Sequence, residues 1–434
     1  MKPTVRRLAR DALVRIEAGA YSHLALPAML RESHLSARDR AQVTDLVYRT
    51  LRGQRRLDDL IARVSKRRVV RMDPPVRAAL RLGAQQLLSG VPPHAAVGET
   101  VAAAPARAQG FVNGVLRALT RLGPPWPEPE SEAVALSYPD WLAERLRSDL
   151  GPEAARATML AGNEPGALTL RPNPRRTEVD ALESALREAG AEVERGRLVP
   201  TALVVRGGGD PAQLLPVADG RATPQDQGSQ AVLAFLDPQP GDRVLDIATA
   251  PGGKATGIAE RIGDDGRVLA LDLNPGRLGL VARATSRLGF DTVDLVVADG
   301  RCLAVPDGVF DRVLLDAPCS GLGVLARRAE ARWRLEPEAI PQLAELQLEL
   351  LEEAARAVRP GGILVYSVCT LTAEETREVV EQAMAKLPEF SPIPPPGAPW
   401  EPSSAGALLL PQAAGTDGMF VAGFRRASRR TAAG

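Results

Sequence analysis

The chain has 434 residues, of which 45% are hydrophobic and 25% are charged, and this length exceeds what a single compact core organises. No apolar run approaches the roughly 18 residues that span a bilayer, and the N-terminus lacks the apolar stretch of a signal peptide. Three widely spaced cysteines and three distant histidines predict neither a disulfide framework nor a metal site. We therefore expect a cytoplasmic, monomeric protein of several domains, with no metal and no membrane partner.

The N-terminal part of the chain is basic and helical. Residues 1–122 carry 22 Lys and Arg against 9 Asp and Glu, whereas the remainder carries 32 against 44. Apolar residues in the basic part recur at helical spacing, as in Leu8, Ala12 and Ile16, and predict a bundle of five to seven helices. We expect residues 1–124 to form a domain whose charge suits a phosphate backbone. A solvated arginine-rich surface is the plainer alternative.

Four prolines within Pro124–Pro129 interrupt the helical pattern and predict a linker. The following stretch, residues 130–220, alternates between helical and strand patterns, and we interpret it as a small α+β subdomain. Its expected helices are Trp141–Leu150 and Val179–Ala189, and its expected strands are Ala167–Arg171 and Leu203–Arg206.

Residues 221–434 alternate short apolar strands with helices, which predicts a mostly parallel, doubly wound α/β sheet of Rossmann-like type. The expected strands are Arg243–Ile247, Val268–Asp272, Val293–Ala298, Arg312–Asp316 and Ile363–Ser367. Ligands of such sheets bind beyond the carboxyl ends of the strands. The polar and thiol side chains that should converge there are Asp246, Asp272, Asp299, Asp316, Cys319 and Cys369.

The loop after the first of these strands, Ala248–Lys254, matches neither a P-loop nor the dinucleotide fingerprint, which favours a nucleoside ligand without phosphate. Asp272 is placed to accept hydrogen bonds from ribose hydroxyls, and Asp299 lies where an adenine amino group would be. This layout predicts S-adenosylmethionine, although aspartates that cap helices are the alternative for any one position. The expected cofactor-binding residues are Ala248, Thr249, Ala250, Pro251, Gly252, Gly253, Lys254, Asp272, Asp299 and Asp316.

Cys319 and Cys369 each follow one of two strands that we expect to be adjacent. A thiolate adds to electron-poor ring carbons, so two thiols at one cleft suggest that one attacks and the other assists release. Position in the sequence does not choose between them. Asp316 lies close to Cys319 in the chain and is expected to hydrogen-bond the ring that is attacked.

Three motifs carry a family resemblance over nearly the whole chain: Asp246–Lys254, Asp316–Gly321 and Tyr366–Thr370. They resemble the RNA (cytosine-5)-methyltransferases of the Sun/Fmu group. The N-terminal helices, including Pro92–Thr100 and Val112–Arg117, are similar to a NusB-like RNA-binding domain. The combination is similar to the bacterial enzymes that methylate a cytosine of small-subunit ribosomal RNA, and it implies that residues 221–434 form a methyltransferase domain dependent on S-adenosylmethionine.

The resemblance also implies roles for the catalytic residues Cys369, Cys319 and Asp316. It assigns the nucleophile to Cys369 and product release to Cys319, whereas DNA cytosine-5 methyltransferases place their nucleophile in a Pro-Cys block like that at Cys319. RNA, ribosomal RNA above all, is the expected partner. A transfer RNA or DNA cytosine-5 methyltransferase and a non-catalytic RNA-binding or antitermination protein remain as alternatives. Side chains expected to contact RNA after the Cys319 loop are Arg327, Arg328, Arg332 and Trp333.

Overall fold

The computed structural model describes residues 4–206, 211 and 214–428, and the chain divides into two compact units. The first, here called the helical unit, comprises Met1–Pro165 and Leu325–Leu335. The second, here called the sheet unit, comprises Gly166–Val324 and Glu336–Gly434. Along the described parts of both units, no helix has the length and apolar character needed to cross a membrane.

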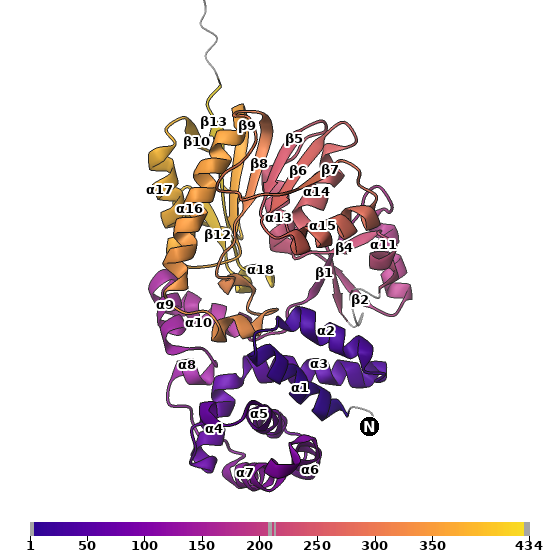
Figure 1. Cartoon of the computed structure of the whole chain (residues 1–434), viewed down its shortest axis with the longest axis vertical. Coiled ribbons are helices and arrows are strands. Elements are labelled where there is room, and N and C mark those ends of the chain that lie inside the picture. Colours follow the sequence, from indigo (N-terminus) through magenta and orange to yellow (C-terminus); the bar gives the residue numbers. More distant parts are fainter. Residues whose placement is uncertain (1–3, 207–210, 212–213, 429–434) are drawn as a thin grey trace, which may run out of the picture. The chain divides into compact units, whose positions relative to one another are not determined.

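The helical unit is built from short amphipathic helices, as their apolar spacing predicts (Figure 1). Its helices are α1 (Val5–Glu17), α2 (Ser22–Glu32), α3 (Ala37–Arg52), α4 (Gln54–Ser65), α5 (Pro74–Leu88), α6 (Pro93–Ala103), α7 (Gln109–Leu122), α8 (Glu132–Ala135), α9 (Asp140–Leu150) and α10 (Pro152–Ala161). The start of α3 shows how sequence sets a boundary, because the Ser36 hydroxyl accepts a hydrogen bond from the Asp39 amide at 3.1 Å. One apolar core joins α4 to α7, and another joins α1 to α3.

A small antiparallel sheet with the order β2-β3-β1-β4 opens the sheet unit. Its elements are β1 (Leu168–Pro172), α11 (Val179–Glu188), β2 (Glu192–Arg195), β3 (Leu203–Arg206), α12 (Leu215–Ala218) and β4 (Ala222–Pro224). Leu182 and Leu186 of α11 are buried with Leu170 and Leu203 in one core, so the helix covers one face of this sheet. The α+β character predicted from the sequence is therefore confirmed.

The larger sheet has nine strands, eight of them in the order β11-β12-β13-β9-β8-β5-β6-β7, while β10 pairs with β13. Strands β5 to β9 are parallel neighbours, and the C-terminal strands are antiparallel. The strands are β5 (Arg243–Ile247), β6 (Arg267–Asp272), β7 (Val293–Val297), β8 (Phe310–Asp316), β9 (Val358–Val368), β10 (Phe390–Pro392), β11 (Glu401–Ser403), β12 (Gly406–Leu409) and β13 (Met419–Arg426). The five predicted parallel strands are thus present, and the antiparallel extension completes a mixed sheet.

Helices cover both faces of this sheet and give it three layers (Figure 1). The helices are α13 (Gln227–Leu236), α14 (Gly253–Ile262), α15 (Pro275–Leu288), α16 (Ala339–Ala357), α17 (Val379–Lys386) and α18 (Pro411–Ala414). Successive strand residues point to opposite faces: Val244 packs with α13 to α15, and Leu245 packs with α16 and α17. Burial on both faces explains why these strands are uniformly apolar in sequence.

The segment Leu325–Leu335 leaves the sheet unit and packs within the helical unit, and the burial of Arg332 corrects its expected RNA contact. Arg332 is fully buried, lies 3.9 Å from the ring centre of Tyr138 and donates to Asn163 Oδ1 at 2.7 Å. The Trp333 indole donates to the Leu51 carbonyl at 3.0 Å. Both side chains therefore anchor the segment. The sequence pattern misled at Arg332 because an arginine suits a buried cation–π contact, here with Tyr138, as well as it suits RNA.

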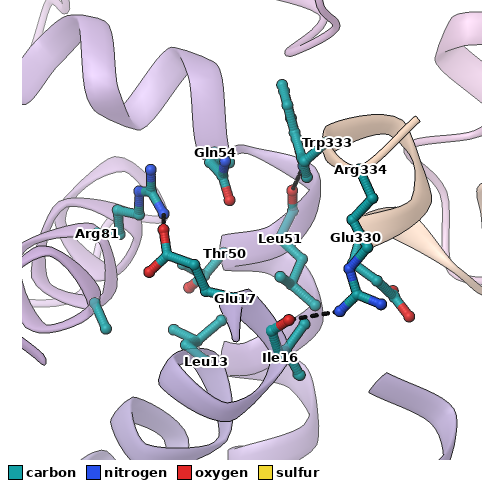
Figure 2. Close-up of a pocket in the computed structure, with 11 residues that line it drawn as sticks. Leu13, Ile16, Glu17, Thr50, Leu51, Gln54, Arg81, Glu330, Trp333 and Arg334 are labelled. Atoms are coloured by element: carbon teal, nitrogen blue, oxygen red, sulfur yellow. Dashed lines mark hydrogen bonds and ion pairs between the residues drawn. The ribbon is translucent and has the colours of Figure 1, made fainter. Parts of the chain in front are cut away.

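A cavity of about 130 Å³ lies beside this anchor (Figure 2). It is lined by residues of helices α1, α3, α4 and α5 together with Glu330, Trp333 and Arg334. Glu17 faces Arg81 across it, with an Nη1 to Oε1 distance of 3.5 Å. All of its lining residues belong to the helical unit, and one of them, Trp333, is a side chain expected from the sequence to contact RNA.

Candidate active site

The two predicted thiols are in contact. Cys319 follows β8 and Cys369 follows β9, and their sulfur atoms are 3.4 Å apart. All three cysteines of the chain are thiols, and the third, Cys302, is exposed. Because β8 and β9 are parallel neighbours, their carboxyl ends bring the two following loops together.

The thiol pair is asymmetric in its protonation. The hydrogen bond with Cys369, followed by burial and by the charges of Cys369 and Glu375, raises the pKa of Cys319 well above its usual range. Cys319 therefore holds its proton more tightly than an ordinary thiol does, while the contact geometry allows either sulfur to donate. With the proton on Cys319, the Cys369 sulfur is the acceptor of the contact.

A buried ion pair lies at the same strand ends. Lys254 Nζ is 2.6 Å from Asp316 Oδ2, and the Ser367 hydroxyl donates to Asp316 Oδ1 at 2.8 Å. Burial alone would lower the pKa of Lys254, but the neighbouring negative charges of Asp316, Cys369 and Asp246 outweigh it and raise the pKa overall. Lys254 is thus a permanent cation in the surroundings of Cys369, where it favours a thiolate.

The loop Ala248–Lys254 connects β5 to α14 and is held from several sides. Gly252 has a φ of 99°, and a Cβ there would lie 2.9 Å from the Val281 side chain, so this tight turn requires glycine. Thr249 donates to Asp246 Oδ2 at 2.6 Å, and Ala250 N donates to Asp272 Oδ2 at 3.3 Å. The loop therefore joins the ends of β5 and β6.

Asp246 and Asp272 are buried, and Asp299 is not. Burial raises the pKa of Asp246 to about 7, and its Oδ1 atom has no hydrogen-bond partner among the described residues. Asp272 also accepts from the Asn274 amide at 2.9 Å. Asp299 lies two residues beyond β7 and pairs with Arg301 at 2.7 Å, and these hydrogen bonds lower its pKa.

These groups fit S-adenosylmethionine. The unpartnered oxygen of Asp246 is an acceptor for an ammonium group, and the start of α14 has no side-chain cap, which leaves its first amides for a carboxylate. Asp272 lies at the end of the neighbouring strand, as a ribose acceptor should. Leu273, which the sequence did not single out, is 67% exposed beside Asp272 and offers an apolar surface to a base.

Sequence reasoning missed two further groups that support the site. Arg171 of β1 donates to the Gly253 carbonyl at 2.7 Å and to Glu260 Oε1 at 2.9 Å, and so ties the small sheet to the cofactor loop. Glu375 is fully buried and accepts a hydrogen bond from the Ser320 amide at 2.8 Å. Neither residue lies at a strand end next to a motif, so strand-end reasoning could not find them.

Comparison with known proteins agrees with this geometry. Residues 233–425 match the family described as 16S rRNA methyltransferase RsmB/F, residues 3–121 match the NusB family, and residues 138–210 match the RsmF/B-like ferredoxin-like domain. These matches accord with the helical bundle, the small α+β sheet and the Rossmann-like sheet.

Curated relatives extend over the full chain. The ribosomal RNA small subunit methyltransferase B of Thermus thermophilus is 38% identical over 434 residues, which cover 98% of this chain and 98% of the relative. The probable ribosomal RNA small subunit methyltransferase B of Bacillus subtilis is 34% identical, with 98% and 99% covered. The crystal structure of the protein PH0851 is similar with a TM-score of 0.86, at 28% identity over 98% of this chain and 99% of that one. The chain therefore belongs to the RsmB/F family of methyltransferases, which depend on S-adenosylmethionine, and it carries a NusB-family domain.

Proposed function

We propose that the protein methylates carbon 5 of a cytosine in 16S ribosomal RNA through a covalent cysteine adduct. The observation that carries this proposal is the contact of the Cys319 and Cys369 thiols beside the Lys254–Asp316 ion pair. Carbon 5 of cytosine is a poor nucleophile until a thiolate adds to carbon 6, so the reaction needs a thiolate with a cation nearby. The names of the Thermus and Bacillus relatives support ribosomal RNA as the substrate.

In the proposed reaction, Cys369 attacks. Its thiolate forms a bond to carbon 6, and the ring electrons that are displaced make carbon 5 nucleophilic. Asp316 accepts a hydrogen bond from the exocyclic amine or the protonated ring nitrogen and so favours the ring form that is attacked. Bound S-adenosylmethionine supplies the methyl group that carbon 5 takes up.

Cys319 acts after methyl transfer. Once Cys369 is bonded to carbon 6, its sulfur is an uncharged thioether, and the main cause of the raised Cys319 pKa is gone. Cys319 then loses its proton to water and removes the proton from carbon 5. The electrons of that C–H bond restore the ring double bond, and the carbon–sulfur bond to Cys369 breaks. The mutual hydrogen bond of the two thiols and the raised pKa of Cys319 support this order.

The target cytosine must leave any base-paired stack to reach these thiols. The NusB-family domain is proposed to hold the RNA electrostatically, since four basic residues between α4 and α5 are exposed: Lys66, Arg67, Arg68 and Arg71. Replacing Arg67 and Arg68 with Gln should weaken RNA binding, and the dependence of log K on log salt should become less steep by up to about 1.5. An unchanged salt dependence would remove this surface from the RNA-binding account.

Bisulfite sequencing tests the whole proposal. Total RNA from a strain that lacks the gene is compared with RNA from the same strain carrying the wild-type or the Cys369→Ala gene. One cytosine of 16S ribosomal RNA should be protected only in the presence of the wild-type protein. Protection of a transfer RNA cytosine would redirect the substrate assignment, and an unchanged map in all three strains would refute the proposed reaction.

A further inference from the structure

The carboxylate of Glu375 joins the two cysteine loops. It lies in a π-helical turn, Glu374–Glu378, and is fully buried. Its donors are all uncharged groups: Ser320 N at 2.8 Å, Ser320 Oγ at 2.5 Å, Thr370 Oγ1 at 3.0 Å, Thr372 Oγ1 at 2.9 Å and Gln347 Nε2 at 3.1 Å. Ser320 immediately follows Cys319, and Thr370 immediately follows Cys369. One carboxylate therefore fixes the backbone on the C-terminal side of both thiols.

A second layer of contacts holds the same arrangement. The Ser320 and Thr370 hydroxyl oxygens are 2.6 Å apart because both donate to the same oxygen, Glu375 Oε2, which links the two loops. Gln347 of α16 donates to the Pro318 carbonyl at 2.9 Å, so the residue before Cys319 is also held. The Tyr366 hydroxyl donates to the Glu375 carbonyl at 2.7 Å. Every one of these partners belongs to the sheet unit.

The strength of the contacts decides what holds the thiols together. A thiol is a weak hydrogen-bond donor and cannot by itself keep two loops in register. Hydrogen bonds to a carboxylate are roughly twice as strong as neutral ones, and Glu375 receives several in a buried setting. Pairing of β8 with β9 and the hydrogen bond from Gly323 N to the Cys369 carbonyl at 2.9 Å bring the loops together, and the Glu375 network adds to them in holding the thiols 3.4 Å apart. Single π-helical turns within α-helices also occur often at functional sites.

We infer that Glu375 is a positioning residue that holds Cys319 in hydrogen-bond contact with Cys369 and thereby serves the release step. The inference rests on the proposed roles of the two cysteines. The negative charge of Glu375 is one of the causes that raise the pKa of Cys319, which keeps that thiol protonated while Cys369 attacks, and the contribution of Glu375 to release is the geometry. Glu375 touches no reacting atom, and its effect passes through Ser320 and Thr370.

The test measures thiol reactivity without RNA. Purified full-length protein is treated with iodoacetamide between pH 6 and 10, and the alkylation of each cysteine is followed by mass spectrometry. Exposed Cys302 reacts in every variant and serves as the internal reference. Glu375→Gln keeps the shape of the side chain and removes its charge, and Ser320→Ala removes one hydroxyl and leaves the carboxylate in place. Glu378→Gln makes the same charge change in the same π-helical turn and is the matched control.

In wild type and in Glu378→Gln, Cys319 should react only at high pH. In Glu375→Gln and in Ser320→Ala, the alkylation of Cys319 at pH 8 should rise about 10-fold relative to Cys302, because a weaker contact with Cys369 lowers the pKa of Cys319 and raises its thiolate fraction. The affinity for S-adenosylhomocysteine should stay unchanged, which shows that the site is folded. If Glu375→Gln does not fold, the alkylation of Cys319 in Ser320→Ala tests the inference. Cys319 reactivity equal to wild type in a folded variant would overturn the inference.

A second experiment measures adduct formation and turnover with RNA. Glu375→Gln should accumulate protein covalently joined to methylated RNA, with an unchanged KM for RNA and a lower kcat. Rapid turnover without such an adduct would also overturn the inference. If no variant, Cys319→Ala included, ever forms an adduct, the proposed function fails, while the result of the thiol arm still decides whether Glu375 positions the cysteines.

Discussion

The cysteine side and the nucleoside side of the site are built differently. Around Cys319 and Cys369, the supporting side chains Glu375 and Gln347 are fully buried, and their hydrogen bonds close a network within the protein. On the nucleoside side, Leu273 is 67% exposed, and the Asp299 carboxylate is partly exposed and paired with Arg301. On the cysteine side, the hydrogen-bond partners come from the protein itself. The nucleoside side presents groups to a ligand.

This difference follows from the chemistry that each region performs. Addition of a thiolate to a ring carbon requires its position and proton to be set in advance, and a buried network of charge-assisted hydrogen bonds provides both. A nucleoside that is exchanged after every turnover needs contacts that form and break, which partly exposed groups allow. Substitutions on the cysteine side should therefore lower turnover, and those on the nucleoside side should lower affinity.

The largest effect is expected from Asp316→Asn. This change removes the partner of Lys254 and the acceptor proposed to hold the cytosine. Turnover should fall by about 10²- to 10⁴-fold, the range for loss of a positioned acid–base group, while S-adenosylmethionine affinity changes far less. Single-turnover methylation of a 16S ribosomal RNA fragment measures the loss of turnover, and calorimetry measures the affinity for S-adenosylmethionine. Equal losses in both would show that Asp316 serves the cofactor and not the base.

Arg171→Met should act on stability. Arg171 and Glu260 are each 6% exposed, and removal of one partner leaves the other charge buried without compensation. The free energy of unfolding of the sheet unit should fall by about 3–5 kcal/mol in chemical denaturation. Arg175→Met is the control, because Arg175 pairs with Asp264, whose side chain is 84% exposed, and such a pair contributes at most about 1 kcal/mol. Similar losses for both variants would contradict a special role for Arg171.

Asp272→Ala should have the smallest of these effects, confined to cofactor affinity. The loss of a buried acceptor for the ribose hydroxyls should weaken S-adenosylmethionine binding by about 1.5–3 kcal/mol. Asp299→Ala should cost less, since that carboxylate is exposed and already paired with Arg301. Calorimetry on both variants compares the two. A greater loss of cofactor affinity for Asp299→Ala than for Asp272→Ala would contradict the expectation that the buried carboxylate contributes more.

The parallel part of the sheet could be predicted because its signal is local. Strand β5 begins and ends where the sequence predicted, since it is a short apolar run with polar or glycine-rich flanks. The convergence of strand ends then places Cys319 near Cys369 without knowledge of any side-chain contact. The antiparallel partners β10 to β12 carry only three or four residues each, too few to show an alternating pattern.

The residues that were missed depend on long-range contacts. Thr372 and Glu375 have the spacing of a helix-capping box, so the sequence offers a sufficient local explanation for Glu375. Its contact with Ser320 spans 55 residues and exists only once β8 and β9 are paired. Arg332 shows the converse, because its basic surroundings predicted an exposed RNA contact, whereas its contact with Asn163 spans 169 residues. Burial of a charge is decided by such partners and not by neighbours in sequence.

The division of labour between the two thiols is tested most directly on a denaturing gel with labelled 16S ribosomal RNA and S-adenosylmethionine. Cys369→Ala should give no methylation and no slowly migrating band. Cys319→Ala should methylate the RNA once and then remain joined to it, because attack proceeds and elimination stalls. The opposite pattern, an adduct with Cys369→Ala and none with Cys319→Ala, would make Cys319 the nucleophile and contradict the account.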